Sequence, residues 1–287
     1  MTETTHQRPL IDIFYRQVIA LGGAKNHLVL LPDADPESAA MDIVASFAGA
    51  AGQRCMAASV LLLVGKEGAT AEDSVLAQVV AKASALKAGT QPGQVGALIT
   101  DDAKAKVLGY ISRAIAEDGA TVLVDGRPWA EGVGAPAEGN WIGPTILVHK
   151  SASDAAVREE IFGPVLSVVR CATREDAIAI ENSNPFGNGA CIYTSSGAQA
   201  NWFISRFRAG MLGVNIGIPV PREPFAFGGL YGTLSKYGDM DLTGEGAIEF
   251  FSNRVKLTCR WPSTDDSPRK GAAAAEPKDK ASFNGKI

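Results

Sequence analysis

The sequence has few cysteines, few histidines and no strongly basic stretch. Its four cysteines show neither CxxC spacing nor the density of a disulfide framework, which fits a reducing compartment and predicts a cytoplasmic protein. The only histidines are His6, His27 and His149; they form no HExxH or Cys/His zinc pattern, so no metal site is predicted. The formal net charge is −4 without a basic block, so neither nucleic acid nor a membrane surface is a predicted partner.

Long apolar runs are also missing. No run approaches the ~18 residues that span a bilayer, and the polar start MTETTHQRPL lacks the hydrophobic segment of a signal peptide. The sequence contains no Walker A motif, and a dinucleotide-like glycine pattern at residues 132–137 is interrupted by Pro136. The composition, with 46% apolar and 20% charged residues over 287 positions, is typical of a globular protein of one to two domains.

Alternating strand and helix patterns predict an α/β fold with a mostly parallel sheet. Strands are expected at 28–31, 59–64, 121–124, 145–148, 165–169, 191–193 and 212–214. Helices are expected after the Asp35-Pro36 cap, at 72–86, at 101–117, after a Thr173/Asp176 capping box and at 198–208. Residues 1–17 are expected to be an irregular leader, and residues 262–287, rich in Pro, Lys, Asp and Ala, a disordered tail.

Cys55 is the first candidate for chemistry. It follows a helix of small residues that ends near Gly52, precedes a buried strand and stands beside Arg54. A cysteine on such a loop next to a cation can be exposed and stabilised as a thiolate. A buried, inert cysteine is the alternative that local sequence leaves open.

Five ordered motifs decide between these alternatives. LGGAKNHLVLLPDAD, GQRCMA, EEIFGPVLSVV, NPFGNGACIYT and GMLGVN followed by PVPREPFAFGG together resemble the aldehyde dehydrogenase superfamily. GAKNH, G-x-RCMA and the IPVP segment are similar to its methylmalonate-semialdehyde dehydrogenase branch. The resemblance covers about residues 18 to 261. It implies a three-layer α/β catalytic domain over 18–253, with the N-terminal NAD-binding half largely missing.

The resemblance also implies roles for individual residues. Cys55 would be the nucleophile that carries a thioester intermediate. Glu160 would bind the hydroxyls of the nicotinamide ribose, and Phe162 would lie against the nicotinamide ring. Gly22 would let the backbone approach the cofactor, because no Cβ intrudes. Arg54 would bind the substrate's carboxylate through its guanidinium.

Ala20 points to the acyl acceptor. Hydrolytic members of the superfamily have a glutamate before the LGG motif, which activates water, whereas this sequence reads Ala20-Leu21-Gly22-Gly23. An alanine cannot act as a base, so this resembles the branch in which coenzyme A takes the acyl group. The expected activity is NAD-dependent oxidation of a malonate- or methylmalonate-type semialdehyde to an acyl-CoA.

The chain departs from the family at both ends of the resemblance. A relative would have a long segment ahead of LGGAKNH, with most of the dinucleotide-binding fold and the oxyanion asparagine. We therefore expect weak NAD binding, an impaired activity and an exposed apolar face. Residues 254–261 resemble the family's oligomerisation strand, so the expected partners are a second copy of the chain or a complementing N-terminal half.

Two other readings remain open. The chain could be a non-catalytic interaction or oligomerisation module that keeps the fold but not the chemistry. It could also be a cysteine hydrolase that pairs Cys55 with His27, which requires contact between these two side chains.

Overall fold

The structure is a computed structural model that describes residues 18–65 and 70–259. The chain divides into two units, residues 1–252 and 253–287, and each is described by itself. The predicted leader, 1–17, and the predicted tail, 262–287, lie outside the described residues. No helix in the described ranges has the length and apolar character needed to cross a membrane.

The centre of the first unit is a seven-stranded sheet, parallel except for one edge strand. Its strands, in spatial order, are β4 (Thr121–Val124), β5 (Thr145–His149), β6 (Val165–Cys171), β3 (Ala58–Val64), β2 (Asn26–Leu30), β7 (Gly189–Tyr193) and β8 (Met211–Val214). Only β4 runs antiparallel to its neighbour, β5. This confirms the predicted α/β class and mostly parallel sheet.

The central strands are mostly apolar and buried because helices cover both faces of the sheet. In β2, Leu28 and Leu30 pack into the larger core, whereas Val29 packs into the smaller core on the opposite face. In β3, Leu61 packs into the larger core and Leu62 into the smaller one. Successive side chains of a strand point to opposite faces, so one short apolar run supplies both cores.

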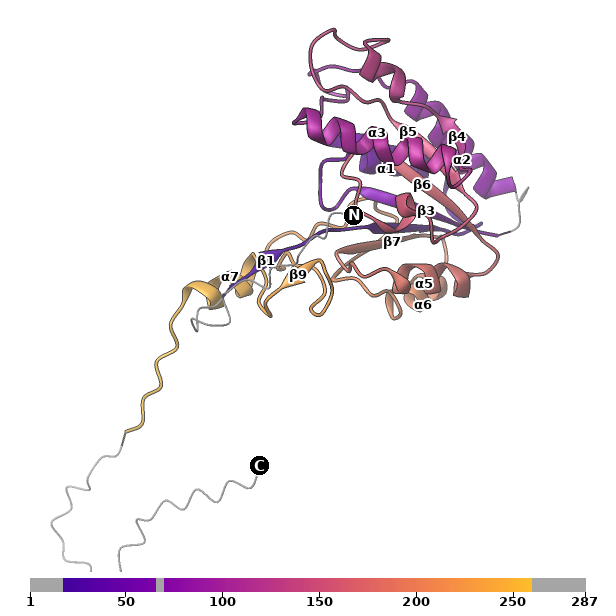
Figure 1. Ribbon diagram of the computed structural model, residues 1–287. Helices are drawn as coiled ribbons and strands as arrows, with labels where there is room; N and C mark the ends of the chain where they lie inside the picture. Colours follow the sequence, from indigo (N-terminus) through magenta and orange to yellow (C-terminus); the bar gives the residue numbers. More distant parts are fainter. Residues whose placement is uncertain (1–17, 66–69, 260–287) are drawn as a thin grey trace, which may run out of the picture. The chain divides into compact units, whose positions relative to one another are not determined.

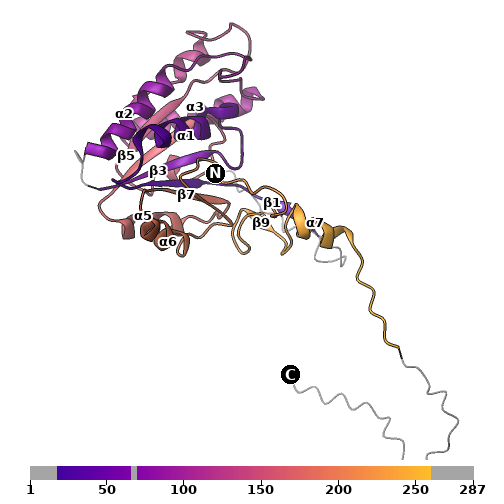
Figure 2. The same ribbon diagram turned by 180° about the vertical axis from the view of Figure 1, so that it is seen from behind.

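Two layers of helices enclose the sheet (Figures 1 and 2). One layer contains α1 (Pro36–Ala48), α2 (Thr70–Ser84) and α3 (Asp101–Ala116). The other contains α5 (Arg174–Ser183) and α6 (Gly197–Ile204). Three further short helices are α4 (Ala155–Arg158), η2 (Gly49–Gly52) and η3 (Arg127–Glu131). The result is the three-layer arrangement that the sequence predicts.

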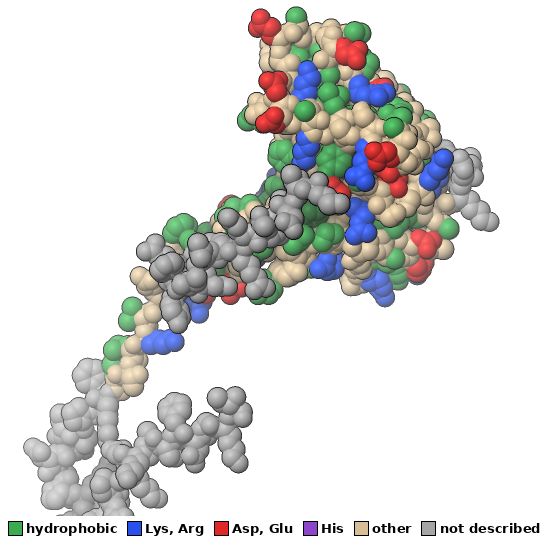
Figure 3. Space-filling view, in the orientation of Figure 1, with side chains coloured by type: hydrophobic (Ala, Val, Ile, Leu, Met, Phe, Trp, Pro, Cys, Tyr) green, Lys and Arg blue, Asp and Glu red, His purple; other side chains and the backbone are tan. Residues whose placement is uncertain are grey.

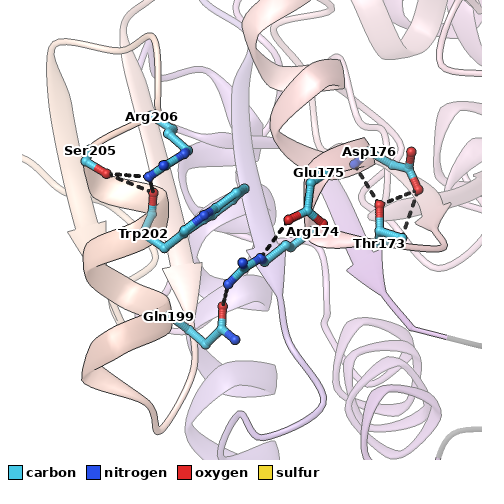
Figure 4. Close-up of polar contacts among 8 residues, drawn as sticks. All are labelled: Thr173, Arg174, Glu175, Asp176, Gln199, Trp202, Ser205 and Arg206. Carbon is cyan, nitrogen blue, oxygen red and sulfur yellow. Dashed lines mark hydrogen bonds and ion pairs between the residues drawn. The ribbon is translucent and has the colours of Figure 1, made fainter.

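The predicted helix caps are present. The Asp35 side chain accepts a hydrogen bond from the backbone N–H of Ser38 at the start of α1. At α5, Thr173 and Asp176 form a reciprocal capping box, visible in Figure 4. The same view shows Arg174 over the Trp202 ring, with the guanidinium carbon 4.2 Å from the ring centroid, which joins α5 to α6.

Helix α6 ends four residues earlier than predicted, at Ile204 instead of Arg208. The hydroxyl of Ser205 and the guanidinium of Arg206 both donate to the carbonyl oxygen of Trp202. These side-chain donors satisfy a carbonyl near the end of the helix, so the chain turns there.

Several short elements had no counterpart in the sequence prediction, among them α4, η3, two strands and one further helix. Strands β1 (Ala20–Leu21) and β9 (Lys236–Tyr237) form a separate antiparallel pair. Helix α7 (Gly244–Phe251) follows, and none of its residues is buried. Two-residue strands show no periodicity, and an eight-residue helix without buried positions has no core pattern to reveal it.

The second unit is described only over residues 253–259, which form neither helix nor strand and are exposed. The oligomerisation strand predicted at 254–261 lies partly outside the described residues, and its pairing with another chain stays a prediction. Figure 3 shows Lys and Arg interspersed with Asp and Glu on the visible face of the protein.

Candidate active site

Cys55 lies on the connection between η2 and β3, as predicted, and its side chain is half-buried. The connection is tightly wound, because Ala50, Ala51 and Gly52 all have φ between +52° and +67°. At Gly52 the backbone passes directly against the carbonyl of Gly163, where a Cβ would collide. Close contact without a side chain therefore ties the cysteine loop to the segment that carries Phe162.

One hollow is lined by Cys55, Arg54, Glu160 and Phe162, together with Ala24 and Lys25. The structure thus brings together four of the five residues that the sequence analysis selects, although they are up to 108 positions apart in the chain. Gly22 is not among the lining residues.

Glu160 is held at the hollow by the segment just before β2. Its Oε1 accepts a 3.0 Å hydrogen bond from the backbone N–H of Ala24. Burial raises the pKa of this carboxyl, and the Ala24 hydrogen bond opposes the rise. Oε2 accepts no hydrogen bond from the described residues, so it can accept one from a ligand.

Lys25 fixes the segment that leads to Glu160. Its ammonium nitrogen donates a 2.8 Å hydrogen bond to the carbonyl of Ala156 in α4, and its side chain is almost completely buried. Burial lowers the pKa of Lys25 to about 7, against the attraction of Glu160 and Glu159. Lys25 was not predicted as a site residue, because nothing in the local sequence shows that a lysine beside a strand start is buried.

Phe162 presents an exposed aromatic ring at the hollow. The residue is 41% exposed, which is unusual for phenylalanine. Its backbone has a φ of +59°, a left-handed conformation that non-glycine residues rarely adopt. The surrounding structure must hold this conformation, since it costs about 1–2 kcal/mol on its own. The ring is therefore held where a ligand can stack on it.

Part of the Arg54 guanidinium already forms hydrogen bonds with the backbone of α1. Its Nη2 donates to the carbonyls of Ala45 and Ser46, at 2.9 and 3.0 Å, near the C-terminus of α1. Its Nε is buried without a hydrogen-bond partner, and desolvation lowers the pKa of the group. A cation at this end of a helix is favourable. Carboxylate binding by Arg54 stays a prediction.

Gly22 extends the backbone pairing between β1 and β9. Its N–H donates to the carbonyl of Ser235 at 2.9 Å, and a Cβ would collide with the carbonyl of Leu234. The missing side chain thus has a structural reason that is independent of the cofactor, and contact with the cofactor stays a prediction.

Two asparagines that the sequence analysis missed converge on Cys55. The carbonyl oxygen of Cys55 accepts hydrogen bonds from Asn26 Nδ2 at 2.7 Å and Asn188 Nδ2 at 3.0 Å. Both side chains are nearly fully buried. They come from motifs that the analysis quoted, GAKNH and NPFGNG, but their convergence depends on contacts across 29 and 133 positions.

His27 does not join the site. It is buried in β2, and burial followed by the nearby Lys25 charge lowers its pKa to about 3. No hydrogen bond within the described residues links it to Cys55, so the geometry gives no support to a Cys55–His27 hydrolase. The described residues also contain no cluster of His, Cys, Asp or Glu suited to a metal.

Two side chains at the hollow carry groups of the kind that the nicotinamide end of NAD could contact. An exposed ring at Phe162 can stack on a flat heterocycle, and the unengaged Oε2 of Glu160 can accept from a ribose hydroxyl. The half-buried thiol of Cys55 lines the same hollow.

The fold is that of an aldehyde dehydrogenase. The model of the Aldehyde dehydrogenase family matches residues 11–256, and the chain belongs to this family.

The chain is similar to several individual members of the family. Malonate-semialdehyde dehydrogenase of Pseudomonas aeruginosa is 40% identical over 250 residues, covering 86% of this chain and 49% of that protein. The crystal structure of methylmalonate-semialdehyde dehydrogenase from Oceanimonas doudoroffii has a TM-score of 0.79 at 39% identity, covering 85% and 49% of the two chains. A Mycobacterium tuberculosis aldehyde dehydrogenase complexed with NAD+ has a TM-score of 0.69 at 31% identity, covering 79% and 45%. The chain therefore spans about half the length of the relatives it matches.

Proposed function

We propose that this chain supplies the cysteine-bearing half of an NAD-dependent dehydrogenase for malonate semialdehyde or methylmalonate semialdehyde. The observation that carries the proposal is the hollow shared by Cys55, Glu160 and Phe162. The names of the relatives, malonate- and methylmalonate-semialdehyde dehydrogenase, support the substrate class.

In the proposed reaction, the Cys55 thiolate attacks the aldehyde carbon and forms a thiohemiacetal. NAD, when bound, supplies the hydride acceptor. Loss of hydride from the former aldehyde carbon leaves an acyl thioester on Cys55. Glu160 holds the ribose through Oε2, and Phe162 keeps water from one face of the ring. Arg54 binds the carboxylate of the substrate with the part of its guanidinium that α1 does not use.

Coenzyme A is the proposed acyl acceptor. Its thiolate attacks the thioester carbonyl, and the Cys55 thiolate leaves, so acyl-CoA forms and the cysteine is restored. The support is Ala20: a methyl group stands where a carboxylate base would be needed to activate water. Ala20 lies in β1, paired with Tyr237.

We infer further that the chain works with a partner. The chain spans about half the length of its relatives. The proposed partner is a second copy of the chain or a complementing N-terminal half, in an oligomer that also uses residues 254–261. A cytoplasmic location belongs to the same proposal, and cell fractionation tests it.

A single-turnover experiment tests this function. Purified chain is mixed with malonate semialdehyde and NAD+, alone and with a polypeptide of the N-terminal half of the P. aeruginosa relative, and NADH is recorded. The proposal expects weak NAD binding alone, a burst of NADH in the mixture and steady turnover only after coenzyme A is added. Turnover without coenzyme A would contradict the acyl-acceptor assignment. Cys55→Ala is the control and should give no burst.

A non-catalytic interaction module is the second candidate function. Helix α7 favours it, because none of its residues is buried and Ile248 and Phe251 are 68% and 85% exposed. The same experiment separates the two: a stable complex with the N-terminal half and no NADH burst would favour the module.

A further inference from the structure

Asn26 and Asn188 both hydrogen-bond to one atom, the carbonyl oxygen of Cys55. Asn26 Nδ2 lies 2.7 Å away and Asn188 Nδ2 lies 3.0 Å away. A carbonyl oxygen has two lone pairs, so its accepting capacity is filled by these two amides. Each side chain is 5% exposed or less, so water does not compete for the hydrogen bonds.

The strand arrangement explains how the two amides meet. Asn26 is the first residue of β2, and Asn188 directly precedes β7. Cys55 lies three residues before β3. Strand β2 is between β3 and β7, and all three are parallel, so their amino ends lie at one edge of the sheet. The cysteine loop therefore crosses the start of β2 and is held from both neighbouring strands.

Both asparagines make further polar contacts. Asn26 Nδ2 donates to the carbonyl of Ala57 as well, and its Oδ1 accepts from the N–H of Gly189. Asn188 Nδ2 also donates to the sulfur of Met56, at 3.0 Å. The amide of Asn26 is therefore held at both its nitrogen and its oxygen, and both asparagines hold the peptide that joins Cys55 to Met56.

We propose that Asn26 and Asn188 are positioning residues that hold the Cys55 thiol toward Glu160 and Phe162. Holding the peptide after Cys55 anchors the Cα of Cys55, which limits the region that its sulfur can reach. Neither asparagine touches the aldehyde; each acts through Cys55. The inference rests on the proposed function only in taking Cys55 as the nucleophile.

The test measures alkylation of Cys55 by iodoacetamide in the full chain, without aldehyde or NAD. Asn188→Leu keeps the size of the side chain and removes both donors. Released from the amide, the thiol samples outward orientations. We expect Cys55 alkylation to rise about three- to tenfold, the range that corresponds to one neutral hydrogen bond. Quantifying the alkylated peptide by mass spectrometry gives the rate.

A matched control separates positioning from general loosening. Asn184 is equally buried and hydrogen-bonds to the carbonyl of Arg158, but does not contact Cys55. Asn184→Leu should leave the Cys55 rate unchanged. The buried Cys171 and Cys191 report on unfolding, since they stay unreactive while the core is intact.

Asn188→Ser is measured beside Asn188→Leu in case one of them loosens the fold. The proposal is tested on the variant in which Cys171 and Cys191 stay protected from alkylation. An unchanged Cys55 rate in that variant, or an equal rise in Asn184→Leu, would overturn the proposal. Failure of the dehydrogenase function appears separately, as absence of the NADH burst in the unmodified chain. In the complemented enzyme, Asn188→Leu should lower kcat while leaving the KM for NAD+ unchanged.

Discussion

At Gly52, φ is +67° and the backbone lies against the carbonyl of Gly163. Two requirements therefore coincide at one residue: a left-handed conformation and the absence of a Cβ. This contact joins the Cys55 loop to the segment that carries Phe162. The relative position of the thiol and the ring thus depends on a glycine that lies outside the reacting groups.

Gly52→Ala should destabilise the protein by more than about 2 kcal/mol, because the left-handed conformation alone costs about 1–2 kcal/mol and the collision adds to it. Two alanine variants provide the comparison. Gly93→Ala, at φ +84° with open space, isolates the conformational cost, and Gly96→Ala, with neither constraint, should be close to neutral. Urea unfolding measures all three. Equal stability of the Gly52 and Gly93 variants would contradict the contact with Gly163.

The sequence motifs identified those site residues whose side chains would take part in the expected chemistry. Cys55, Glu160 and Phe162 were selected from the sequence and line one hollow in the structure. Asn26 and Lys25 were not selected, because their importance comes from burial and from contacts with distant backbone carbonyls. Short-range sequence patterns contain no information on such contacts.

At the scale of the elements, helices and strands were predicted correctly where burial gives their apolar residues a regular spacing. The apolar runs that became β2 and β3 and the face of α1 are all buried, and their positions matched within a few residues. The antiparallel β1–β9 pair and α7 were missed. Their residues face no core, so no hydrophobic period marks them.

The capping box of α5 gives a test at this scale. Thr173 accepts a hydrogen bond from the N–H of Asp176, and the Asp176 side chain accepts from the N–H of Thr173. Thr173→Ala should cost about 1 kcal/mol of unfolding free energy, whereas Thr173→Ser, which keeps the hydroxyl, should cost less than half as much. Thermal unfolding compares the two. Equal losses would show that the cap bond is not the cause.

Glu181, the buried carboxyl of α5, predicts a pH dependence. Burial raises its pKa from 4.5 to about 7, although the N–H and charge of Arg208 favour the ionised form. Because the folded pKa is the higher one, the folded state binds the extra proton between these values. The contribution of Glu181 to stability is therefore full below pH 4.5 and is lost as the pH rises through about 7.

Glu181→Gln should remove this dependence. Glutamine keeps an oxygen that can accept from the N–H of Arg208, and it carries no charge to bury. Relative to the unchanged protein, the variant should gain stability between pH 4.5 and 7, by at most about 1.4 kcal/mol per pH unit. Urea titrations at pH values across this range measure the difference. A constant difference would contradict the raised pKa.

At the scale of the whole molecule, we predict that the protein associates with another chain through α7. Ile248 and Phe251 are largely exposed on a helix without buried residues. Large exposed hydrophobic side chains on one short helix are typical of an interface. Changing both to glutamate should reduce association, with itself or with a complementing half, and leave the unfolding free energy within about 0.5 kcal/mol.

Met41→Glu is the control for this change, because Met41 is 56% exposed on α1. It should leave association unaffected. Sedimentation velocity over a range of protein concentrations measures both variants. Identical association of the α7 double variant and the Met41 variant would contradict the assignment of α7 to an interface.

The central claim is that the thiol of Cys55 takes an acyl group from an aldehyde beside a bound nicotinamide. Intact-protein mass spectrometry tests it most directly, with the complemented chain, malonate semialdehyde and NAD+ but no coenzyme A. The account predicts one acyl group per chain, located on the Cys55 peptide, dependent on NAD+ and released by coenzyme A. Acylation at another residue, or none at Cys55 while NADH forms, would contradict it.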